Sequence, residues 1–310
     1  MLILQVYSKS TLFSSPPIVY NGRNTEGVSP ERRSVMIQFG MPTLIENRTL
    51  QENIDLCSRL GLRFIELNMN FPEYQVECLE QTGRLLEAAD AAGIYYTIHL
   101  DENLNIADFN SLVTGAYLET VRRTVAAAKA LLPLRDRYGD PARPLTVNMH
   151  MHHGIYITLP DRKVRMYERN RDVYLASCRR FRDLCGEWIG DAPVMITVEN
   201  TDGFLPFEQE AIDLFLESPC FGLTWDIGHS KATGEKDVPF ILAHQDRLVH
   251  FHIHDGTEQP PRNHLALGDG EIDLQDRLKL AEERGCRCVL ETKTVKALEQ
   301  SVEWLRVQAE

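Results

Sequence analysis

Residues 194–226 read VMITVENTDGFLPFEQEAIDLFLESPCFGLTWD. The runs Val194–Val198 and Phe221–Trp225 are rich in β-branched and aromatic residues and are typical of buried strands. The apolar residues of Phe207–Glu217, between these runs, recur with the period of an amphipathic helix. A helix that separates two buried strands predicts a crossover connection, and therefore two parallel strands in one sheet.

The same alternation of strand and helix extends in both directions along the chain. Strands are expected at Val35–Phe39, Leu62–Leu67, Ile94–Ile98, Leu145–Met151, Val194–Val198, Phe221–Trp225, Leu248–Ile253 and Cys288–Leu290. Helices are expected at Leu50–Leu60, Tyr74–Ala92, Leu118–Leu132, Val164–Trp188, Phe207–Glu217, Val238–Asp246, Leu274–Arg284 and Val295–Val307. Eight such pairs predict an α/β fold, a (β/α)8 TIM barrel that forms a single domain over residues 34–310. An open, doubly wound sheet is the alternative, although no Gly-x-Gly-x-x-Gly motif of a dinucleotide site follows a strand.

Residues 1–33 differ from the rest of the chain. The clusters Ser14–Pro17 and Asn21–Asn24 are typical of turns, so we expect an irregular N-terminal arm. The opening apolar residues are too few, and lack the basic flank, for a signal peptide.

The composition restricts the classes of function. The chain has 310 residues, of which 43% are hydrophobic, and no apolar run is long enough to span a membrane. Its 33 basic and 45 acidic residues give a net charge of −12, which argues against a broad nucleic-acid-binding face. Seven cysteines without a framework spacing favour a reducing, cytoplasmic location over a disulfide scaffold.

The histidines are concentrated where the predicted strands end. Nine of the ten histidines lie at or just beyond the carboxyl ends of strands, and only His244 lies within a predicted helix. The nine are His99, His150, His152, His153, His229, His250, His252, His254 and His264. In a (β/α)8 barrel this end of the strands is the face on which active sites are built.

Three carboxylates lie at the same level. Glu199, Asp226 and Glu291 each close an apolar strand. A buried charge costs several kcal/mol unless it is paired or bound to a metal ion, and a mixed set of imidazole and carboxylate ligands suits Zn²⁺ or Mn²⁺. Two simpler interpretations stay open, namely that Asp226 caps the turn that follows it and that Glu291 pairs with Lys293.

These motifs, taken in order, resemble the xylose-isomerase-like TIM barrels, a superfamily that includes the endonuclease IV family. The resemblance runs from about residue 34 to the C-terminus. Its endonuclease IV-like pieces are His99 with Asn105, His152-His-Gly154, Glu199-Asn-Thr-Asp-Gly203, Asp226-Ile-Gly-His229, His252-Ile-His-Asp255, His264-Leu-Ala-Leu-Gly-Asp-Gly270 and Leu290-Glu-Thr292.

Two features depart from endonuclease IV. Arg262 stands where that family has a metal-binding aspartate, and arginine cannot bind a metal ion. The basic, aromatic DNA-binding loop after the second strand is replaced by Asn68-Met-Asn-Phe-Pro-Glu-Tyr74. Together with the charge of −12, these differences argue against a full three-zinc cluster and against DNA as a partner.

The sugar isomerase and epimerase branch of the superfamily implies a smaller site. By this resemblance, Glu199, Asp226, His252 and Glu291 would hold one divalent ion (Zn, Mn, Mg or Co), and Glu199 and Glu291 would transfer protons through an enediolate. Arg262, His254 and Asn200 would contact a small carbohydrate, phosphorylated or not. The superfamily contains both monomers and homodimers.

The alternative is a multinuclear zinc hydrolase that acts on a phosphoester. It is motivated by histidines that the one-metal site does not need, and it would hold up to three ions. Its additional ligands would be His99, His152, His229 and His264.

Overall fold

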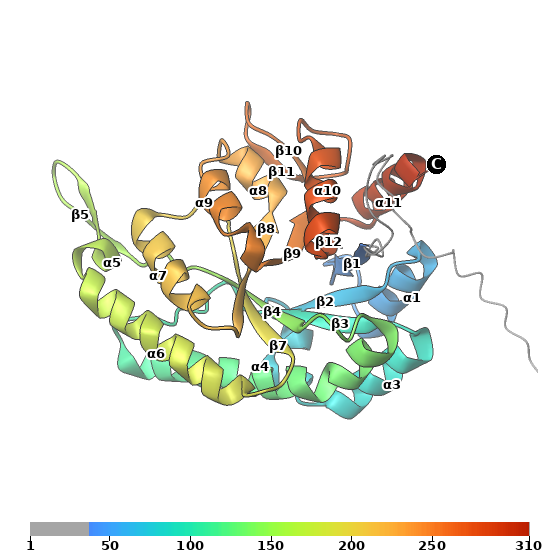
Figure 1. Ribbon diagram of the computed structural model, residues 1–310, viewed down its shortest axis with the longest axis horizontal. Coiled ribbons are helices and arrows are strands. Elements are labelled where there is room, and N and C mark those ends of the chain that lie inside the picture. The colour runs from blue at the N-terminus through green and yellow to red at the C-terminus, as the bar shows by residue number, and fades with distance from the viewer. Residues whose placement is uncertain (1–36, 310) are drawn as a thin grey trace, which may run out of the picture.

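The computed structural model describes residues 37–309 and shows a closed barrel of eight parallel strands (Figure 1). The strands pair in the order β1-β12-β9-β8-β7-β4-β3-β2. Their bounds are β1 (Gln38–Pro42), β2 (Phe64–Asn68), β3 (Tyr95–His99), β4 (Leu145–His150), β7 (Val194–Glu199), β8 (Phe221–Asp226), β9 (Leu248–Ile253) and β12 (Arg287–Leu290). The predicted (β/α)8 barrel is confirmed, whereas the expected arm at residues 1–33 lies outside the described residues.

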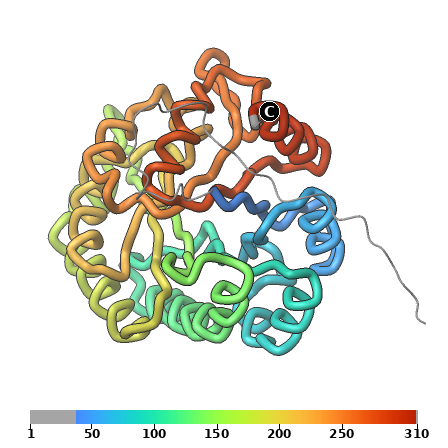
Figure 2. The backbone as a smooth tube through the Cα atoms, turned by 45° about the vertical axis from the view of Figure 1, so that its right-hand side comes forward, coloured from blue at the N-terminus to red at the C-terminus, as the bar shows by residue number. Residues whose placement is uncertain are grey.

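Helices surround the barrel, as Figure 2 shows. They are α1 (Leu50–Leu60), α2 (Val76–Leu79), α3 (Thr82–Ala92), α4 (Ser111–Tyr138), α5 (Met166–Arg169), α6 (Arg171–Ile189), α7 (Pro206–Leu216), α8 (Ile227–Ala232), α9 (Val238–Ala243), α10 (Leu274–Arg284) and α11 (Val295–Ala309), with 3-10 turns η1 (Pro72–Tyr74) and η2 (Gln245–Arg247). Among residues 37–309, no helix combines the length and the apolar character that crossing a membrane requires.

Local signals explain where α1 begins and ends. Thr49 and Glu52 form a reciprocal capping box at its first turn, which satisfies backbone N–H groups that have no partner within the helix. Gly61 ends the helix with φ 75°, a left-handed conformation that glycine adopts without steric cost. The chain then enters β2 directly.

Several elements differ from the expected ones. The single helix expected over Tyr74–Ala92 is divided into η1, α2 and α3. The helix expected over Leu118–Leu132 is longer, because α4 begins at an Asn110 cap and continues through Pro133. Two short antiparallel hairpins were also missed, β5 (Tyr156–Thr158) with β6 (Lys163–Arg165), and β10 (Asp255–Thr257) with β11 (Arg262–Leu265). Strands of three or four residues are too short to show a hydrophobic period.

The barrel interior becomes more polar toward the carboxyl ends of the strands. Near the amino ends, the Phe64 ring stacks on Tyr95 with centroids 5.2 Å apart. Two residues further along the same strands, Thr97 donates a hydrogen bond of 2.9 Å to Glu66, and both side chains are buried. Because side chains alternate between the two faces of a strand, the next inward position on β3 is His99.

Gly40 on β1 is expected to be essential for packing at the apolar end of the barrel. A Cβ atom at this position would lie 2.5 Å from two atoms of the Phe64 ring, too close for any carbon contact. We therefore expect Gly40→Ala to lower the free energy of unfolding by about 1–3 kcal/mol in urea denaturation. Gly115 in α4 is the matched control, since nothing lies within 4 Å of its added Cβ. Gly115→Ala should be neutral or stabilising by up to about 1 kcal/mol, and equal effects of the two changes would contradict this account.

Candidate metal centre

Four side chains with metal-binding atoms converge at the carboxyl ends of neighbouring strands. Glu199, Asp226 and His252 belong to β7, β8 and β9, and Glu291 follows directly after β12. All four are buried, and each offers one ligand atom within 4.8 Å of those of the others. The Nδ1 atom of His252 lies 3.0 Å from Glu199 Oε1 and 2.9 Å from Glu291 Oε2. The structure thus brings together the four residues that the resemblance suggests as ligands.

A fifth buried residue, Glu66 on β2, orients His252. Glu66 Oε1 lies 2.8 Å from His252 Nε2, on the side of the ring opposite to Glu199 and Glu291. In this structure the ring forms its hydrogen bond through Nδ1, to Glu199 Oε1, and Nε2 has none. With a proton kept on Nε2 by the charge of Glu66, Nδ1 would be available to a metal ion, as in carboxylate–histidine–metal arrangements. The sequence analysis did not select Glu66. It carries the same signal as Glu199, a carboxylate within the apolar strand Phe64-Ile-Glu66.

The electrostatics of this cluster fit a bound cation. Burial favours the neutral form of Glu199, but His252 and His150 hold its pKa well below the ordinary range. Burial likewise opposes protonation of His252, yet the carboxylates of Glu199, Glu291 and Glu66 raise its pKa well above the usual value. Glu291 Oε2 is buried without a hydrogen bond. A set of three carboxylates and one imidazole, with an unpartnered oxygen, is chemically suited to a divalent ion.

The helix cap at Asp226 and the ion pair of Glu291 with Lys293, which the simpler interpretations predict, are both present. Asp226 caps α8, because its Oδ1 atom accepts a hydrogen bond of 2.6 Å from the backbone N–H of His229. Lys293 donates a hydrogen bond of 2.8 Å to Glu291 Oε1. Each contact occupies one oxygen of its carboxylate, and the other oxygen lies near a histidine, Asp226 Oδ2 near His254 and Glu291 Oε2 near His252.

A second group adjoins the first and shares Glu199 with it. The Nε2 atoms of His99 and His150 lie 3.2 Å apart, and each lies 3.3 Å from Glu199 Oε2. His99 Nδ1 donates to the Leu100 carbonyl at 2.7 Å. Burial opposes protonation of His99, but the Glu199 carboxylate beside Nε2 raises its pKa. His152, which the motif comparison placed in this role, belongs to no group of candidate ligands found among residues 37–309. Its Nδ1 atom accepts a hydrogen bond from Gly154.

A third group consists of His229, His254 and His264. His264 Nδ1 donates a hydrogen bond of 3.0 Å to the backbone carbonyl of Glu291, and burial lowers the pKa of His264 to about 4. Its ring is therefore neutral at neutral pH, with Nε2 as the acceptor. Arg262, two residues earlier on β11, is exposed and belongs to none of these groups.

Asn200, an expected substrate contact, is instead used within the protein. Its amide Nδ2 donates to the Asp226 carbonyl at 2.8 Å and to Ser230 Oγ at 3.1 Å. Its Oδ1 atom accepts a hydrogen bond of 2.9 Å from the Asp226 N–H. The side chain is completely buried, so both amide protons are already donated and Asn200 braces β7 against β8.

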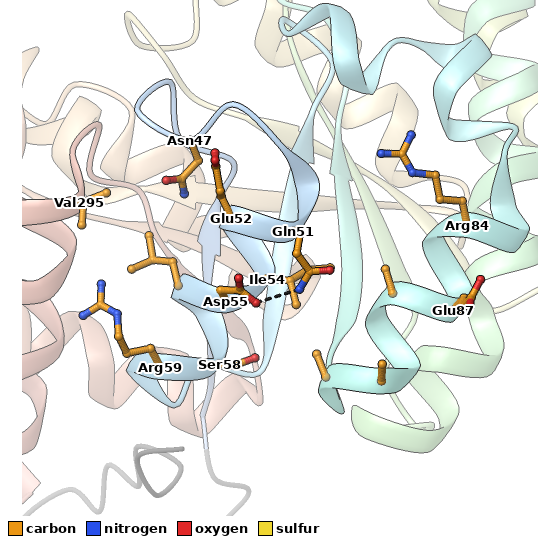
Figure 3. A pocket seen from close by; sticks show the side chains of 14 residues that line it. Asn47, Gln51, Glu52, Ile54, Asp55, Ser58, Arg59, Arg84, Glu87 and Val295 are labelled. Atoms are coloured by element: carbon orange, nitrogen blue, oxygen red, sulfur yellow. Dashed lines mark hydrogen bonds between the residues drawn. The ribbon is translucent and has the colours of Figure 1, made fainter. Parts of the chain in front are cut away.

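A groove on the described part of the chain lies away from these groups. It runs along the outside of the barrel between α1 and α3, as Figure 3 shows. None of its lining residues belongs to the histidine and carboxylate groups, and its polar side chains include Gln51, Glu52, Asp55, Arg59, Arg84 and Glu87. The chemistry of the molecule is therefore concentrated at the carboxyl ends of the strands.

The fold agrees with comparisons to known proteins. Residues 54–308 match the family model described as xylose isomerase-like TIM barrel, and the chain belongs to this family. No curated protein matches the chain.

Solved structures share the fold at low sequence identity. A D-tagatose 3-epimerase-like protein is 20% identical with a TM-score of 0.66, and the match covers 88% of this chain and 97% of that one. A 3-keto-D-glucoside 4-epimerase from E. coli is 13% identical with a TM-score of 0.65, covering 87% and 99%. An IOLI protein with a bound zinc atom is 15% identical with a TM-score of 0.61, covering 88% and 95%.

The bracing role of Asn200 predicts a large effect on stability. Asn200→Ala removes three buried hydrogen bonds and leaves the Asp226 backbone unpaired, so we expect a loss of roughly 2–4 kcal/mol in urea denaturation. Asn103→Ala is the control, because Asn103 is exposed and bonds only to Asp101 two residues away. The control should change stability by less than about 0.5 kcal/mol. A loss below 1 kcal/mol at Asn200 would be inconsistent with a bracing role.

Proposed function

We propose that this protein is a divalent-metal-dependent sugar or sugar-phosphate isomerase or epimerase. The observation that carries the proposal is the convergence of Glu199 and Glu291 on the same nitrogen of His252, at 3.0 and 2.9 Å. Two carboxylates that face one point from different strands can serve as a pair for proton removal and proton return. The family, together with the names of the structural neighbours, supports a small carbohydrate substrate.

In the proposed reaction, Glu199, Asp226, His252 and Glu291 would hold one ion of Zn, Mn, Mg or Co. When bound, such an ion supplies Lewis-acid stabilisation of the negative charge that develops on the substrate oxygens.

The chain itself moves the proton. One of the two glutamates takes the proton from the carbon next to the carbonyl, and the C–H electron pair enters the enediolate. The other glutamate returns a proton, either to the opposite face of the same carbon for epimerisation or to the former carbonyl carbon for isomerisation. In isomerisation the hydroxyl proton also passes to the former carbonyl oxygen, so that the adjacent oxygen becomes the new carbonyl. His229, His264 and Arg262 would orient hydroxyl or phosphate groups at the mouth.

Proton exchange tests this role of Glu291. Ketoses and ketose phosphates, including tagatose, ribulose and allulose, are incubated with the Mn²⁺- or Co²⁺-loaded protein in D₂O. We expect deuterium to appear by NMR at the carbon next to the carbonyl. Glu291→Gln should slow this exchange about 10²- to 10⁴-fold, because an amide cannot accept the proton.

Metal content is measured on the same samples, so that loss of the ion is distinguished from loss of the base. Glu303→Gln is the matched control, since Glu303 is an exposed residue of α11. Wild-type exchange rates in a metal-loaded Glu291→Gln variant would contradict the assigned role, and absence of exchange in the wild type across the panel would contradict the proposed function.

A second candidate, a multinuclear zinc phosphoesterase, is favoured by the geometry of His99, His150 and Glu199. Their three ligand atoms are separated by 3.2, 3.3 and 3.3 Å. The edges of a tetrahedral zinc site with bonds of about 2.0–2.1 Å measure about 3.3–3.4 Å. These residues are therefore spaced as three ligands of a second ion, with Glu199 shared between the two sites.

The number of metal ions bound per chain distinguishes the two candidate functions. The isomerase is expected to retain one ion per chain by elemental analysis after gel filtration, with the same number in the His99→Ala/His150→Ala variant. His152→Ala serves as the control for removing an imidazole from this face. Two or more zinc ions in the wild type and in the control, with loss of one in the double variant and turnover of an aryl phosphodiester, would support the hydrolase instead.

A further inference from the structure

The hydrogen bonds of His254 place a proton on its Nε2 atom and fix the orientation of its ring. The side chain is completely buried just beyond the end of β9. The backbone N–H of His264 donates a hydrogen bond of 2.7 Å to His254 Nδ1. Nδ1 also lies 3.2 Å from the Asp255 carbonyl, so it is held between a backbone donor and a backbone acceptor. Nε2 lies 2.9 Å from Asp226 Oδ2, and because a carboxylate oxygen accepts, Nε2 carries a proton and donates it.

We infer that His254 is a positioning residue that fixes the carboxylate of Asp226 and links it to the β10–β11 hairpin. The inference rests on the proposed metal centre, in which Asp226 is a ligand. Asp226 Oδ1 accepts from the His229 N–H, and Oδ2 accepts from His254, so both oxygens are held and the plane of the carboxylate is set. Such hydrogen-bonded support typically determines the geometry and affinity of a metal site.

The space around His254 is shaped for its ring. A Cβ atom at Gly228 would lie 1.9 Å from Cε1 and 2.0 Å from Nδ1 of His254, so any larger residue at position 228 would displace the imidazole. The residue that donates to Nδ1, His264, has a φ of 53°, a left-handed conformation that costs energy for a residue other than glycine. This strained backbone is held by the hydrogen bond to His254 and by that of the His264 side chain to Glu291.

The contacts of its two nitrogens distinguish His254 from His229 and His264, the other members of the third group. Both of its nitrogens have partners within the protein, Nε2 in Asp226 and Nδ1 in the backbone of Asp255 and His264, so we infer that His254 supports a ligand and is not itself one. The hairpin that it contacts through His264 also carries Arg262. A displacement of this hairpin would consequently be transmitted to Asp226 through a single imidazole.

Two nearly isosteric variants test the inference. His254→Met fills the space without an N–H donor, whereas His254→Gln retains a donor near the position of Nε2. Co²⁺ affinity is measured by competition with a chromogenic chelator, and the absorption spectrum of the bound Co²⁺ reports its ligand geometry. We expect His254→Met to weaken Co²⁺ binding roughly 10- to 100-fold with a changed spectrum, and His254→Gln to restore most of the affinity.

His244→Gln is the matched control, because His244 follows α9 and contacts Asp213 and the Phe240 carbonyl. Wild-type affinity and spectrum in a folded His254→Met variant would overturn the inference, whereas a wild type that binds no metal would contradict the proposed function. Should the variants fail to fold, ¹⁵N NMR of the histidine rings in the wild type decides the question. The expected result is an Nε2-protonated His254 with and without Zn²⁺. A His254 ring that lacks the Nε2 proton, or that binds the metal, would overturn the inference.

Discussion

The pairing of β1 with β12 closes the sheet, and the arrangement of the site depends on this closure. The two strands are parallel, with Gln38 opposite Arg287 and Gly40 opposite Val289. Since all eight strands run in one direction, their carboxyl ends form a single ring. Closure therefore brings Glu66 on β2 to His252 on β9 across the barrel interior. In an open sheet with the same strand order, these two strands would lie far apart.

Burying polar and charged side chains in the barrel interior, at the carboxyl ends of the strands, lowers the stability of the fold. Glu66, Glu199 and His252 are buried inside the barrel, where unpaired charges would be strongly destabilising. In the protein alone, a protonated His252 among carboxylates compensates part of this charge. A divalent ion would supply the compensation in another form, and it requires His252 to be neutral at Nδ1. The proton on His252 and a metal ion would therefore compete to compensate the same carboxylates. The apolar packing around the barrel, such as Phe64 against Gly40, offsets the remaining cost.

Much of the fold and of the candidate site can be predicted from the sequence, because both depend on local patterns. Apolar runs ending in Glu199, Asp226 and Glu291 identify strands and their functional ends together. What could not be predicted depends on contacts between distant segments. Strand parity places His150 inside the barrel beside His99, whereas a motif comparison selects His152, which lies beyond the strand. The role of His254 depends on a backbone N–H ten residues away, and no local pattern encodes the protonation of an imidazole ring.

Glu199 explains how one arrangement supports two hypotheses about the number of ions. Its Oε1 atom lies beside His252, and its Oε2 atom lies beside His99 and His150 and accepts a hydrogen bond from Asn148. If only Oε1 serves an ion, the two histidines are still matched to a sugar. A sugar hydroxyl would replace the contact that the two Nε2 atoms now make with each other, accepting from one ring or donating to the other. A carbohydrate hydroxyl would then occupy the position that a second zinc ion would take in a hydrolase. Under the proposed function, the pair is thus a hydroxyl-binding site beside the proton-transferring carboxylate, which accounts for histidines that a one-metal centre does not require.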